Sequence, residues 1–227
     1  MTVALVTGPS RGIGRATALS LARRGTGLAL LGRPSAALDE TAAQARHSAS
    51  RVEVVPCDLS DGAQIDAAAR QVLDVLGAPD ALVHNAGTIH RATIEETSDE
   101  AYDEQLGVNL RAPFLLTRAL LPAMRQAGRG RIVFVSSISA TLGSPRAAAY
   151  CASKWGLVGL MKSLAEELSG SNLMTVAVLP GSVDTAMLIG AGFQARMSAE
   201  EVAKTLTHYA LDAPLAHNGG VIEMFGV

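Results

Sequence analysis

Short apolar or β-branched runs alternate with longer stretches of helical periodicity along the whole chain. Each short run is flanked by Gly, Pro, Asp or Asn, residues that end strands and form turns. The seven predicted strands cover residues 3–7, 28–31, 52–55, 81–84, 131–136, 174–179 and 221–225, and the helical stretches cover about 12–24, 36–48, 61–76, 98–126, 148–168 and 198–211. Strands that alternate with helices form right-handed βαβ units and a parallel sheet covered on both faces. The pattern predicts a single-domain, doubly wound α/β fold over residues 1–227, with about seven parallel strands.

Composition and charge exclude several classes of protein. Of the 227 residues, 48% are hydrophobic and 18% are charged, which suits a packed globule and argues against intrinsic disorder. The formal net charge is −2 and the basic residues are scattered, so we expect no nucleic-acid partner. There is no apolar run of about 18 residues and no amino-terminal leader pattern, so we expect no membrane partner and a cytoplasmic protein. Cys57 and Cys151 fit no metal-binding pattern, and we expect reduced thiols and no metal site.

Three glycines follow the first predicted strand directly, in the segment from Thr7 to Gly14. At the first βα turn of a doubly wound sheet, the helix amino terminus offers unpaired N–H groups and a partial positive charge. Gly8 would allow the tight turn, Gly12 would let the backbone approach a pyrophosphate, and Gly14 would allow close packing of helix on sheet. The alternative is a glycine-rich turn without a ligand, because the GxxxGxG spacing departs from the commoner GxGxxG. The position after the first strand favours a dinucleotide site in a Rossmann-type fold.

The end of the second predicted strand indicates which dinucleotide binds. NAD-binding proteins place an Asp or Glu there, where it accepts hydrogen bonds from the ribose hydroxyls. This strand ends in Gly32-Arg33-Pro34 and has no carboxylate. Arg33 and Arg11 can instead hold a 2′-phosphate, each through a charged hydrogen bond of about 1.5–3 kcal/mol. The sequence therefore predicts NADP(H), the alternative being that the two arginines merely face solvent.

Tyr150 and Lys154 lie four residues apart in a predicted helix, so both side chains project from one face. A phenol has an ordinary pKa near 10 and accepts a proton poorly at neutral pH. A positive charge about 4 Å away would stabilise the phenolate by roughly 4 kcal/mol at an effective dielectric constant near 20, or roughly three pKa units. A shielded pair could then act as a general acid and base. The alternative is an ordinary pair on a solvated helix face.

Ser137 stands thirteen residues before Tyr150, at the end of a predicted strand. Its hydroxyl can donate a hydrogen bond to a substrate oxygen on which negative charge develops. Ser136 is the neighbouring alternative, and the spacing to Tyr150 favours Ser137. Cys151 has no His nearby in sequence, so we interpret it as an ordinary thiol rather than a nucleophile.

The order of these motifs resembles that of the short-chain dehydrogenase/reductase family over nearly the whole chain. The matching segments are Thr7–Gly14, Asn85-Ala86-Gly87, Asn109, Ser137, the YxxxK segment from Tyr150 to Lys154, and Pro180-Gly181 continuing to Thr185. The glycine loop up to Ala16 is similar to that of 3-oxoacyl-(acyl-carrier-protein) reductases. Two departures are modest: His84 stands where the family often has a second Asn before the NAG segment, and Gly107 stands where many members have Asn.

The resemblance implies a role for each catalytic candidate. Asn109, Ser137, Tyr150 and Lys154 would form the catalytic set. Lys154 would also hold the nicotinamide ribose, and Asn109 would support a proton-relay water.

The resemblance also extends the set of cofactor-binding candidates. Asp58 and Leu59 would lie by the adenine, and Asn85 would lie on the adenosine side of the cofactor, although it could equally be a turn residue. The full expected set is Gly8, Ser10, Arg11, Gly12, Ile13, Gly14, Arg33, Asp58, Leu59, Asn85, Ala86, Gly87, Tyr150, Lys154, Pro180, Gly181, Val183 and Thr185.

Residues 182–197 form the longest segment without a clear element, and their apolar side chains are interspersed with glycines. Such a segment is typical of a lid over a moderately apolar substrate. The alternative is that it packs against a neighbouring subunit. Our candidate substrate contacts are Ser139, Met187 and Leu188. We interpret His90 and Arg91, just after the NAG segment, as surface loop residues rather than cleft residues.

The function implied by the resemblance is the interconversion of a small-molecule carbonyl and its alcohol by hydride transfer with NADP(H), with Tyr150 as general acid and base. Residues 1–135 would bind the cofactor, and residues 136–227 would supply the catalytic and substrate part. The apolar helix over about 150–168 would join the subunits of a homodimer or homotetramer, unless its apolar face packs in the monomer core. The alternative function is a catalytically idle NADP(H)-binding regulatory protein. A third, an epimerase or dehydratase, usually needs a larger carboxyl-terminal substrate domain.

Overall fold

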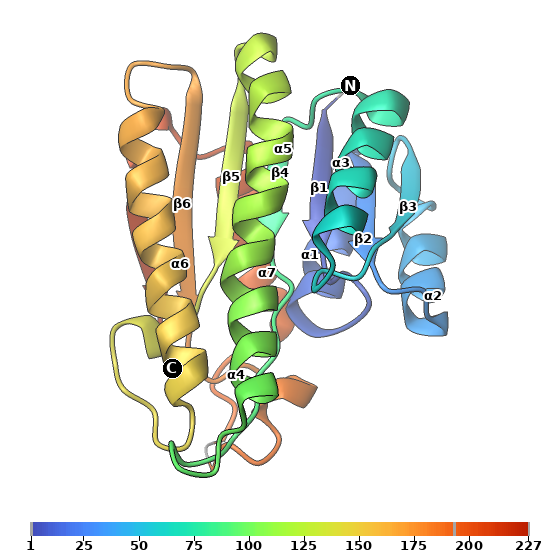
Figure 1. Ribbon diagram of the computed structural model, residues 1–227. Helices are drawn as coiled ribbons and strands as arrows, with labels where there is room; N and C mark the ends of the chain where they lie inside the picture. Colours follow the sequence, from blue (N-terminus) through green and yellow to red (C-terminus); the bar gives the residue numbers. More distant parts are fainter. Residues whose placement is uncertain (1, 193, 227) are drawn as a thin grey trace.

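The computed structural model describes residues 2–192 and 194–226, which form a seven-stranded sheet in the order β3-β2-β1-β4-β5-β6-β7 (Figure 1). Every neighbouring pair of these strands is parallel. The strands are β1 Val3–Thr7, β2 Gly27–Gly32, β3 Val52–Pro56, β4 Ala81–His84, β5 Gly130–Val135, β6 Leu173–Pro180 and β7 Gly220–Met224. The predicted doubly wound parallel fold is confirmed, and the ends of the strands lie within one residue of the prediction.

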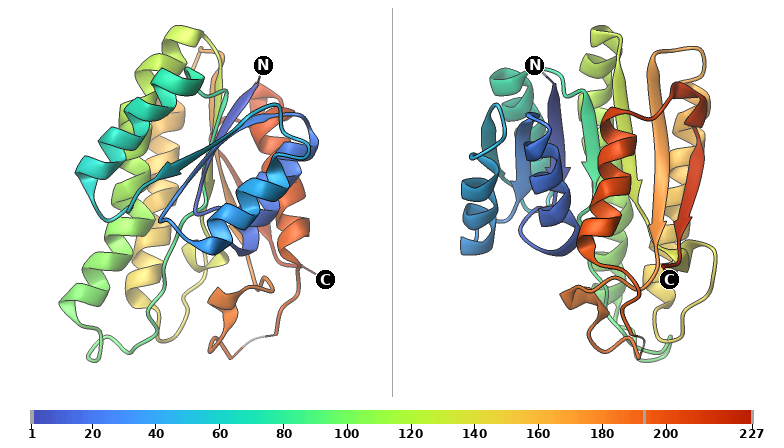
Figure 2. Two further views of the ribbon diagram at one scale, coloured as in Figure 1. Left: turned by 90° about the vertical axis from the view of Figure 1, so that its right-hand side faces the viewer. Right: turned by 180° about the vertical axis from the view of Figure 1, so that it is seen from behind.

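Helices cover both faces of the sheet (Figure 2). One face carries α1 Gly12–Arg23, α2 Ala36–Ala45 and α7 Ala199–Leu211, and the other carries α3 Gly62–Leu76, α5 Ala112–Ala127 and α6 Ala148–Glu167. Successive strand residues point to opposite faces, so Leu5 of β1 packs with the second group of helices while Val6 packs with the first. Within the described ranges, no helix combines the length and apolarity that a membrane crossing requires.

The chain reverses its winding between β1 and β4, which are neighbours in the sheet. In doubly wound sheets, ligands bind in the crevice at the carboxyl ends of the strands that flank such a reversal. The glycine loop follows β1 and the Asn85–Gly87 turn follows β4, so both lie at this crevice. The loops after β5 and β6 extend from the same edge of the sheet (Figure 1). The fold therefore gathers most of the predicted site residues at one edge.

Short turns occupy the opposite edge of the sheet, where helices lead back into strands. Gly25, Gly77, Gly128 and Gly170 lie in these turns with positive φ angles, which suit a residue without a Cβ. An added Cβ would meet nothing within 4 Å at any of the four positions. This edge carries none of the candidate site residues.

The stretch predicted as one helix over 98–126 contains a local irregularity. It consists of α4 Asp99–Leu106, a π-helical turn Gly107–Arg111 and α5. Pro113 has no N–H, so the carbonyl of Asn109 finds no donor four residues further on, and a π turn is the local adjustment. Asn109 therefore lies inside the irregular turn. Shorter 3₁₀ turns cover Ile138–Ala140, Ala186–Leu188 and Leu215–His217.

Two of the predicted helices begin at a serine cap. The Ser98 hydroxyl accepts a hydrogen bond from the N–H of Ala101 at the start of α4. At α7, Ser198 and Glu201 form a complete capping box, in which each side chain bonds the other residue's backbone N–H.

His84 at the end of β4 is fully enclosed. Its ring stacks on Phe134 of β5, with ring centres 4.8 Å apart, and its Nε2 lies 2.8 Å from the Thr117 hydroxyl. Burial lowers the pKa of His84 from 6.5 to about 3, because no nearby carboxylate offsets the cost of charging the ring. His84 is therefore neutral in the folded protein at every pH above about 3.

We expect this histidine to make the protein less stable in mild acid. Below pH 6.5 the unfolded chain protonates His84 and the folded chain does not, so stability falls as pH falls towards the folded pKa. At pH 5 the loss should reach about 2 kcal/mol, at about 1.4 kcal/mol per pH unit. Urea unfolding of wild type and His84→Asn between pH 7 and pH 5 measures this loss of stability. The difference in stability between the two should shrink by about that amount towards pH 5, and a constant difference would contradict the prediction.

Candidate active site

Tyr150 and Lys154 lie on the buried face of α6 near its amino terminus. The two residues are only 7% and 3% exposed. The Lys154 ammonium donates a hydrogen bond to the carbonyl oxygen of Val135, 2.9 Å away, and lies 5.6 Å from the centre of the Tyr150 ring. The pair is therefore an enclosed one at the carboxyl end of β5 and not part of a solvated helix face.

Ser137 faces Tyr150, whereas Ser136 does not. The Ser137 side chain lies close enough to the Tyr150 phenol to lower its pKa in part. The Ser137 hydroxyl also accepts the N–H of Ser139 in the 3₁₀ turn that follows β5. The Ser136 hydroxyl instead donates to the backbone carbonyl of Lys154 at 3.0 Å. Ser136 thus fixes α6 against β5, and Ser137 is the serine that can meet a substrate.

The acidity of the buried pair differs from the sequence-based expectation. Burial raises the pKa of the Tyr150 phenol and outweighs the nearby Ser137 side chain and the charge of Arg91, which both act in the opposite direction. Burial also lowers the pKa of Lys154 to about 8. Our expectation that Lys154 would lower the phenol pKa was wrong for this arrangement, because it left out the cost of moving a phenolate out of water.

The Asn109 side chain is fully buried and connects three segments. Its Oδ1 accepts the N–H of Thr88 at 2.8 Å, and its Nδ2 donates to the Thr88 carbonyl at 2.9 Å and to the Ser153 hydroxyl at 3.0 Å. The π turn, the segment after β4 and α6 are held together at this point. The side-chain amide of Asn109 is thus engaged in these bonds. The backbone carbonyl of Asn109 is the group that Pro113, which has no N–H, leaves without an α-helical donor.

The glycine loop has the tight backbone geometry that its sequence predicts. Gly8 and Gly12 have positive φ angles of 64° and 54°, which residues with a Cβ rarely adopt. A Cβ on Gly14 would lie 2.2 Å from the Gly8 carbonyl oxygen and 2.4 Å from Nδ2 of Asn85. This is the close helix–sheet packing that we expected of Gly14. Ser10 and Ile13 are half-buried in the same loop.

Asn85 ties the turn after β4 to the end of β1. Its Nδ2 donates to the carbonyl oxygens of Thr7 and Gly8 at 3.0 and 3.2 Å. The buried Thr7 hydroxyl accepts the backbone N–H groups of Asn85 and Ala86, each at 3.0 Å. Asn85 therefore holds the glycine loop in place.

Two exposed arginines lie beyond the carboxyl ends of the neighbouring strands β1 and β2. Arg33 follows β2 directly, and Arg11 caps the start of α1. Within the described ranges no carboxylate lies within 4 Å of either guanidinium. Asp58 lies near Arg33, and its pKa is lowered mainly by hydrogen bonds from Ser60 and further by the Arg33 charge. Leu59, beside Asp58, is half-buried against the core.

The segment after β6 lies next to the glycine loop. The Gly181 N–H bonds the Met224 carbonyl at 2.8 Å, next to Pro180 at the end of β6. Val183 is buried and pairs with Met197, so the two ends of the predicted lid are held together. The methyl group of Thr185 would lie 3.1 Å from a Cβ placed on Gly12. The lid therefore begins next to the glycine loop.

The three candidate substrate contacts lie in two different loops. Ser139 is 8% exposed, and its hydroxyl lies 3.0 Å from that of Ser144. Met187 and Leu188 lie in the 3₁₀ turn of the lid, and the Met187 methyl group would lie 4.0 Å from a Cβ on Gly87. Gly87 in turn lies beside the Lys154 ammonium, at 3.5 Å from such a Cβ. Met187 and Lys154 thus both approach Gly87.

Arg91, which we expected to be a surface loop residue, does lie in a loop. It is half-buried, and its Nη2 donates to the Met187 carbonyl at 3.3 Å. His90, by contrast, is exposed and its Nε2 lies 2.6 Å from Glu104. The only sequence signal for Arg91 was its distance of four residues from Gly87.

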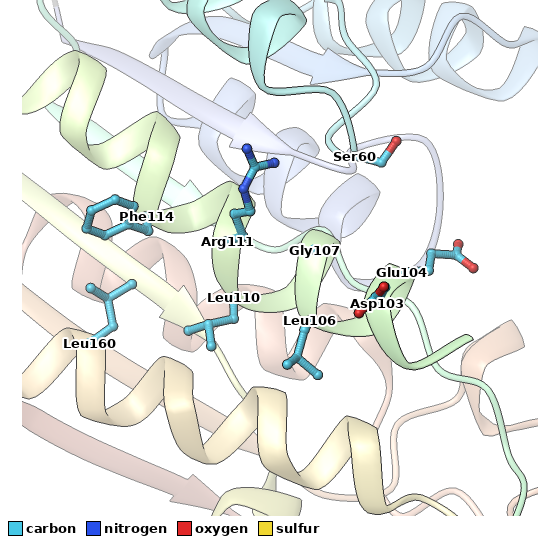
Figure 3. A pocket seen from close by; sticks show the side chains of 9 residues that line it. All are labelled: Ser60, Asp103, Glu104, Leu106, Gly107, Leu110, Arg111, Phe114 and Leu160. Atoms are coloured by element: carbon cyan, nitrogen blue, oxygen red, sulfur yellow. The ribbon is translucent and has the colours of Figure 1, made fainter. Parts of the chain in front are cut away.

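A separate apolar groove of about 690 Å³ lies on the outer surface between the α4–α5 region and α6 (Figure 3). It is lined by Ser60, Asp103, Glu104, Leu106, Gly107, Leu110, Arg111, Phe114 and Leu160. None of these is a catalytic candidate. In the described part of the chain, no cluster of His, Cys, Asp or Glu is placed to hold a metal ion, and Cys57 and Cys151 are unpaired.

Comparison with known proteins gives a consistent result. The family model described as short chain dehydrogenase matches residues 2–194. The chain is 32% identical to a 3-oxoacyl-(acyl-carrier-protein) reductase of Thermotoga maritima, covering 99% of this chain and 96% of that one. It is 37% identical to a D-threitol dehydrogenase of Mycolicibacterium smegmatis, covering 81% and 70%. The crystal structure of levodione reductase superposes with a TM-score of 0.93 at 27% identity, covering 99% of this chain and 96% of that one.

Proposed function

Because the chain belongs to the short-chain dehydrogenase/reductase family, whose members are nicotinamide-dependent oxidoreductases, we propose that it reduces a carbonyl to an alcohol with NADPH. Tyr150 is the general acid in this direction and the general base in the reverse one. The observation that carries the proposal is the enclosed cluster in which the Tyr150 phenol meets the Ser137 hydroxyl beside Lys154. Relatives that act on 3-oxoacyl groups and on D-threitol support a substrate that is a carbonyl compound or its alcohol.

The crevice between β1 and β4 fits a dinucleotide. Side chains at Gly8, Gly12 and Gly14 would be strained or would collide, so the loop keeps its backbone N–H groups accessible at the start of α1. We propose that this loop holds the pyrophosphate, that Asp58, Leu59 and the Asn85–Gly87 turn flank the adenosine, and that the segment from Pro180 to Thr185 borders the nicotinamide. When bound, the cofactor supplies the hydride.

The catalytic residues then have separate tasks. Ser137 donates a hydrogen bond to the substrate oxygen, which stabilises the negative charge that develops there. Tyr150 gives its phenolic proton to that oxygen, and its raised pKa favours the protonated form that a reduction needs. Lys154 binds the nicotinamide ribose and supplies positive charge beneath the phenol. The backbone carbonyl of Asn109 holds a water through which the proton is replaced.

Selection of NADP(H) rests on Arg11 and Arg33. Arg33 is exposed at the end of β2 and Arg11 is exposed at the start of α1, and neither has a carboxylate within 4 Å among the described residues. A 2′-phosphate would give each a charged hydrogen bond, worth about 1.5–3 kcal/mol. An NAD-binding protein would instead place a carboxylate near the ribose. The arrangement favours the phosphorylated cofactor.

The activity test uses purified protein, a panel of ketones, and NADPH or NADH as the reductant. We expect NADPH oxidation with some ketones, at a kcat/KM for cofactor at least about tenfold above that for NADH. In Arg33→Asp the preference should narrow or reverse, because the new carboxylate repels a 2′-phosphate and accepts ribose hydroxyls. Absorbance at 340 nm records both.

Arg70→Asp is the matched control, because it makes the same charge change on the exposed surface of α3, away from the end of β2, and should keep the preference. An unchanged preference in Arg33→Asp would refute the cofactor assignment. NADPH binding without turnover of any ketone would favour the idle regulatory protein instead.

We also propose that the chain forms a homodimer or homotetramer, as is common in its family. The outer face of α5 and α6 borders the apolar groove of Figure 3 and exposes 47% of Phe114 and 53% of Trp155. Large exposed aromatic residues are enriched at protein interfaces. Sedimentation of the purified protein as a single chain at micromolar concentration would contradict this assembly.

A further inference from the structure

Arg91 is held at the mouth of the catalytic site by contacts on both sides of its loop. The N–H of His90 donates to Oε1 of the buried Gln105 at 3.1 Å, and the N–H of Ala92 donates to the carbonyl of Arg146 at 3.0 Å. The guanidinium between them donates to the Met187 carbonyl of the lid. The position of Arg91 is therefore set by the fold.

The guanidinium lies near the candidate catalytic residues. Its partner Met187 extends towards Gly87 and the Lys154 ammonium, which approach the same point in space. The Arg91 charge also acts on the buried phenol, whose pKa it lowers in part. A substrate whose carbonyl meets Tyr150 and Ser137 would thus lie within reach of this cation.

Arg91 has no counter-ion of its own among the described residues. The acidic side chains on the same rim are already engaged: Glu96 lies 3.6 Å from Arg146, and Glu104 lies 2.6 Å from His90. No described carboxylate lies within 4 Å of Arg91. The guanidinium is partly open to solvent, so water or a ligand anion can accept hydrogen bonds from its free N–H donors.

The guanidinium keeps the capacity to bind such a ligand. It has five N–H donors in a planar fork, and one of its nitrogens is bonded to the lid carbonyl. The remaining edge of the fork can hold a carboxylate through two parallel hydrogen bonds. A substrate anion could therefore be bound while the contact between Arg91 and the lid stays in place.

We propose that Arg91 is a substrate-binding residue that recognises an anionic group, a carboxylate in the simplest case, on the carbonyl compound reduced at Tyr150. The inference rests on the proposed reductase function and narrows its substrate class to keto acids and related anions. Because Arg91 also donates to the Met187 carbonyl, the same residue would contact both the bound anion and the lid. The neutral members of a ketone panel are the poorer substrates.

The test compares keto acids of different chain length, from 2-oxo to 5-oxo, with their methyl esters at pH 7. Wild type should favour the acid over its ester in kcat/KM by about tenfold or more at the chain length that fits, the value of one charged hydrogen bond. Arg91→Gln should lower that ratio by about tenfold. Arg91→Lys should retain part of it, because it keeps the charge and loses the fork.

The matched control is Arg70→Gln, which removes one positive charge from the exposed surface of α3, where the arginine likewise has no described carboxylate within 4 Å. Its acid-to-ester ratio should stay within about twofold of that of wild type. Thermal unfolding of all three variants shows whether each is folded. A second readout does not need turnover: calorimetry with the protein saturated with NADP⁺ should show pentanoate binding in wild type, weaker binding in Arg91→Gln, and weak binding of pentanamide to both.

Three results would overturn the proposal. The first is an ester reduced as well as its acid at every chain length by wild type. The second is an equal loss for acid and ester in Arg91→Gln, which would make Arg91 an anchor for the lid alone. The third is a tenfold weaker Kd for NADPH in that variant, which would assign the charge to the cofactor. Absence of reduction with any ketone, together with discrimination between pentanoate and pentanamide, would reject the proposed reaction and keep the anion site.

Discussion

Replacement of Tyr150 by phenylalanine should lower kcat for ketone reduction by at least about a hundredfold, and by up to about ten-thousandfold. The substitution removes the single proton that the ring can give to the substrate oxygen, while the ring itself stays in a site that is 7% exposed. The Ser137 hydroxyl and the Lys154 ammonium remain in place. Steady-state NADPH oxidation with a ketone substrate measures the loss.

Cofactor binding separates the chemical role of Tyr150 from a structural one. The Kd for NADPH, measured by fluorescence titration, should change by less than about fivefold in Tyr150→Phe, because one neutral hydrogen bond is worth only about 1 kcal/mol. Tyr102→Phe is the matched control, since Tyr102 is an exposed residue of α4. Full activity in Tyr150→Phe would reject the proposed mechanism, and loss of activity in Tyr102→Phe would point to a nonspecific effect.

Gly14→Ala should damage both the fold and the cofactor site. The new Cβ would lie 2.2 Å from the Gly8 carbonyl oxygen, and both this oxygen and Nδ2 of Asn85 are fixed by the turn between β1 and β4. Overpacking of this kind costs about 1–3 kcal/mol or more, even though alanine is intrinsically the better helix former by about 1 kcal/mol. We expect a net loss of about 2 kcal/mol in stability and a Kd for NADPH raised at least about tenfold.

The control for this substitution adds the same methyl group where there is room. Gly143 lies in an exposed loop, and a Cβ there would meet nothing within 4 Å. Gly143→Ala should therefore keep the stability and the Kd for NADPH of wild type. Urea unfolding and NADPH titration of both variants decide the matter. A Gly14→Ala protein as stable as wild type would mean that the loop is far more adaptable than its geometry indicates.

The sequence predicted well those features that depend on short-range patterns. Strand runs such as Val3–Thr7, flanked by turn residues, located all seven strands because the alternation of strands and helices leaves few other folds. Gly14 was assigned to close packing because the first βα turn of such a sheet requires it. The order of Ser137, Tyr150 and Lys154 indicated a cluster that the structure brings together around the end of β5.

Features that depend on contacts between distant segments were harder to predict. The pKa of Tyr150 is raised by burial, and the degree of burial follows from the packing of α6 on β5 rather than from the YxxxK spacing. The contacts that hold the Arg91 loop could not be predicted, because they come from distant parts of the chain. The Arg146 carbonyl accepts the N–H of the neighbouring Ala92, and the Met187 carbonyl accepts the Arg91 guanidinium. The π turn depends on the missing N–H of Pro113. It was not predictable because a proline in a long helical pattern can equally produce a kink or a break in the helix.

The division of the sheet into two unlike edges has a practical consequence for handling the protein. The turns at Gly25, Gly77, Gly128 and Gly170 lie opposite the catalytic crevice and have open space around them. Exposed loop tips of this kind tolerate insertions best. A peptide tag or surface-attachment sequence placed in the turn at Gly77 would therefore orient the immobilised protein with its cleft facing the solution, which makes that turn a suitable attachment point for a biosensor or a flow reactor.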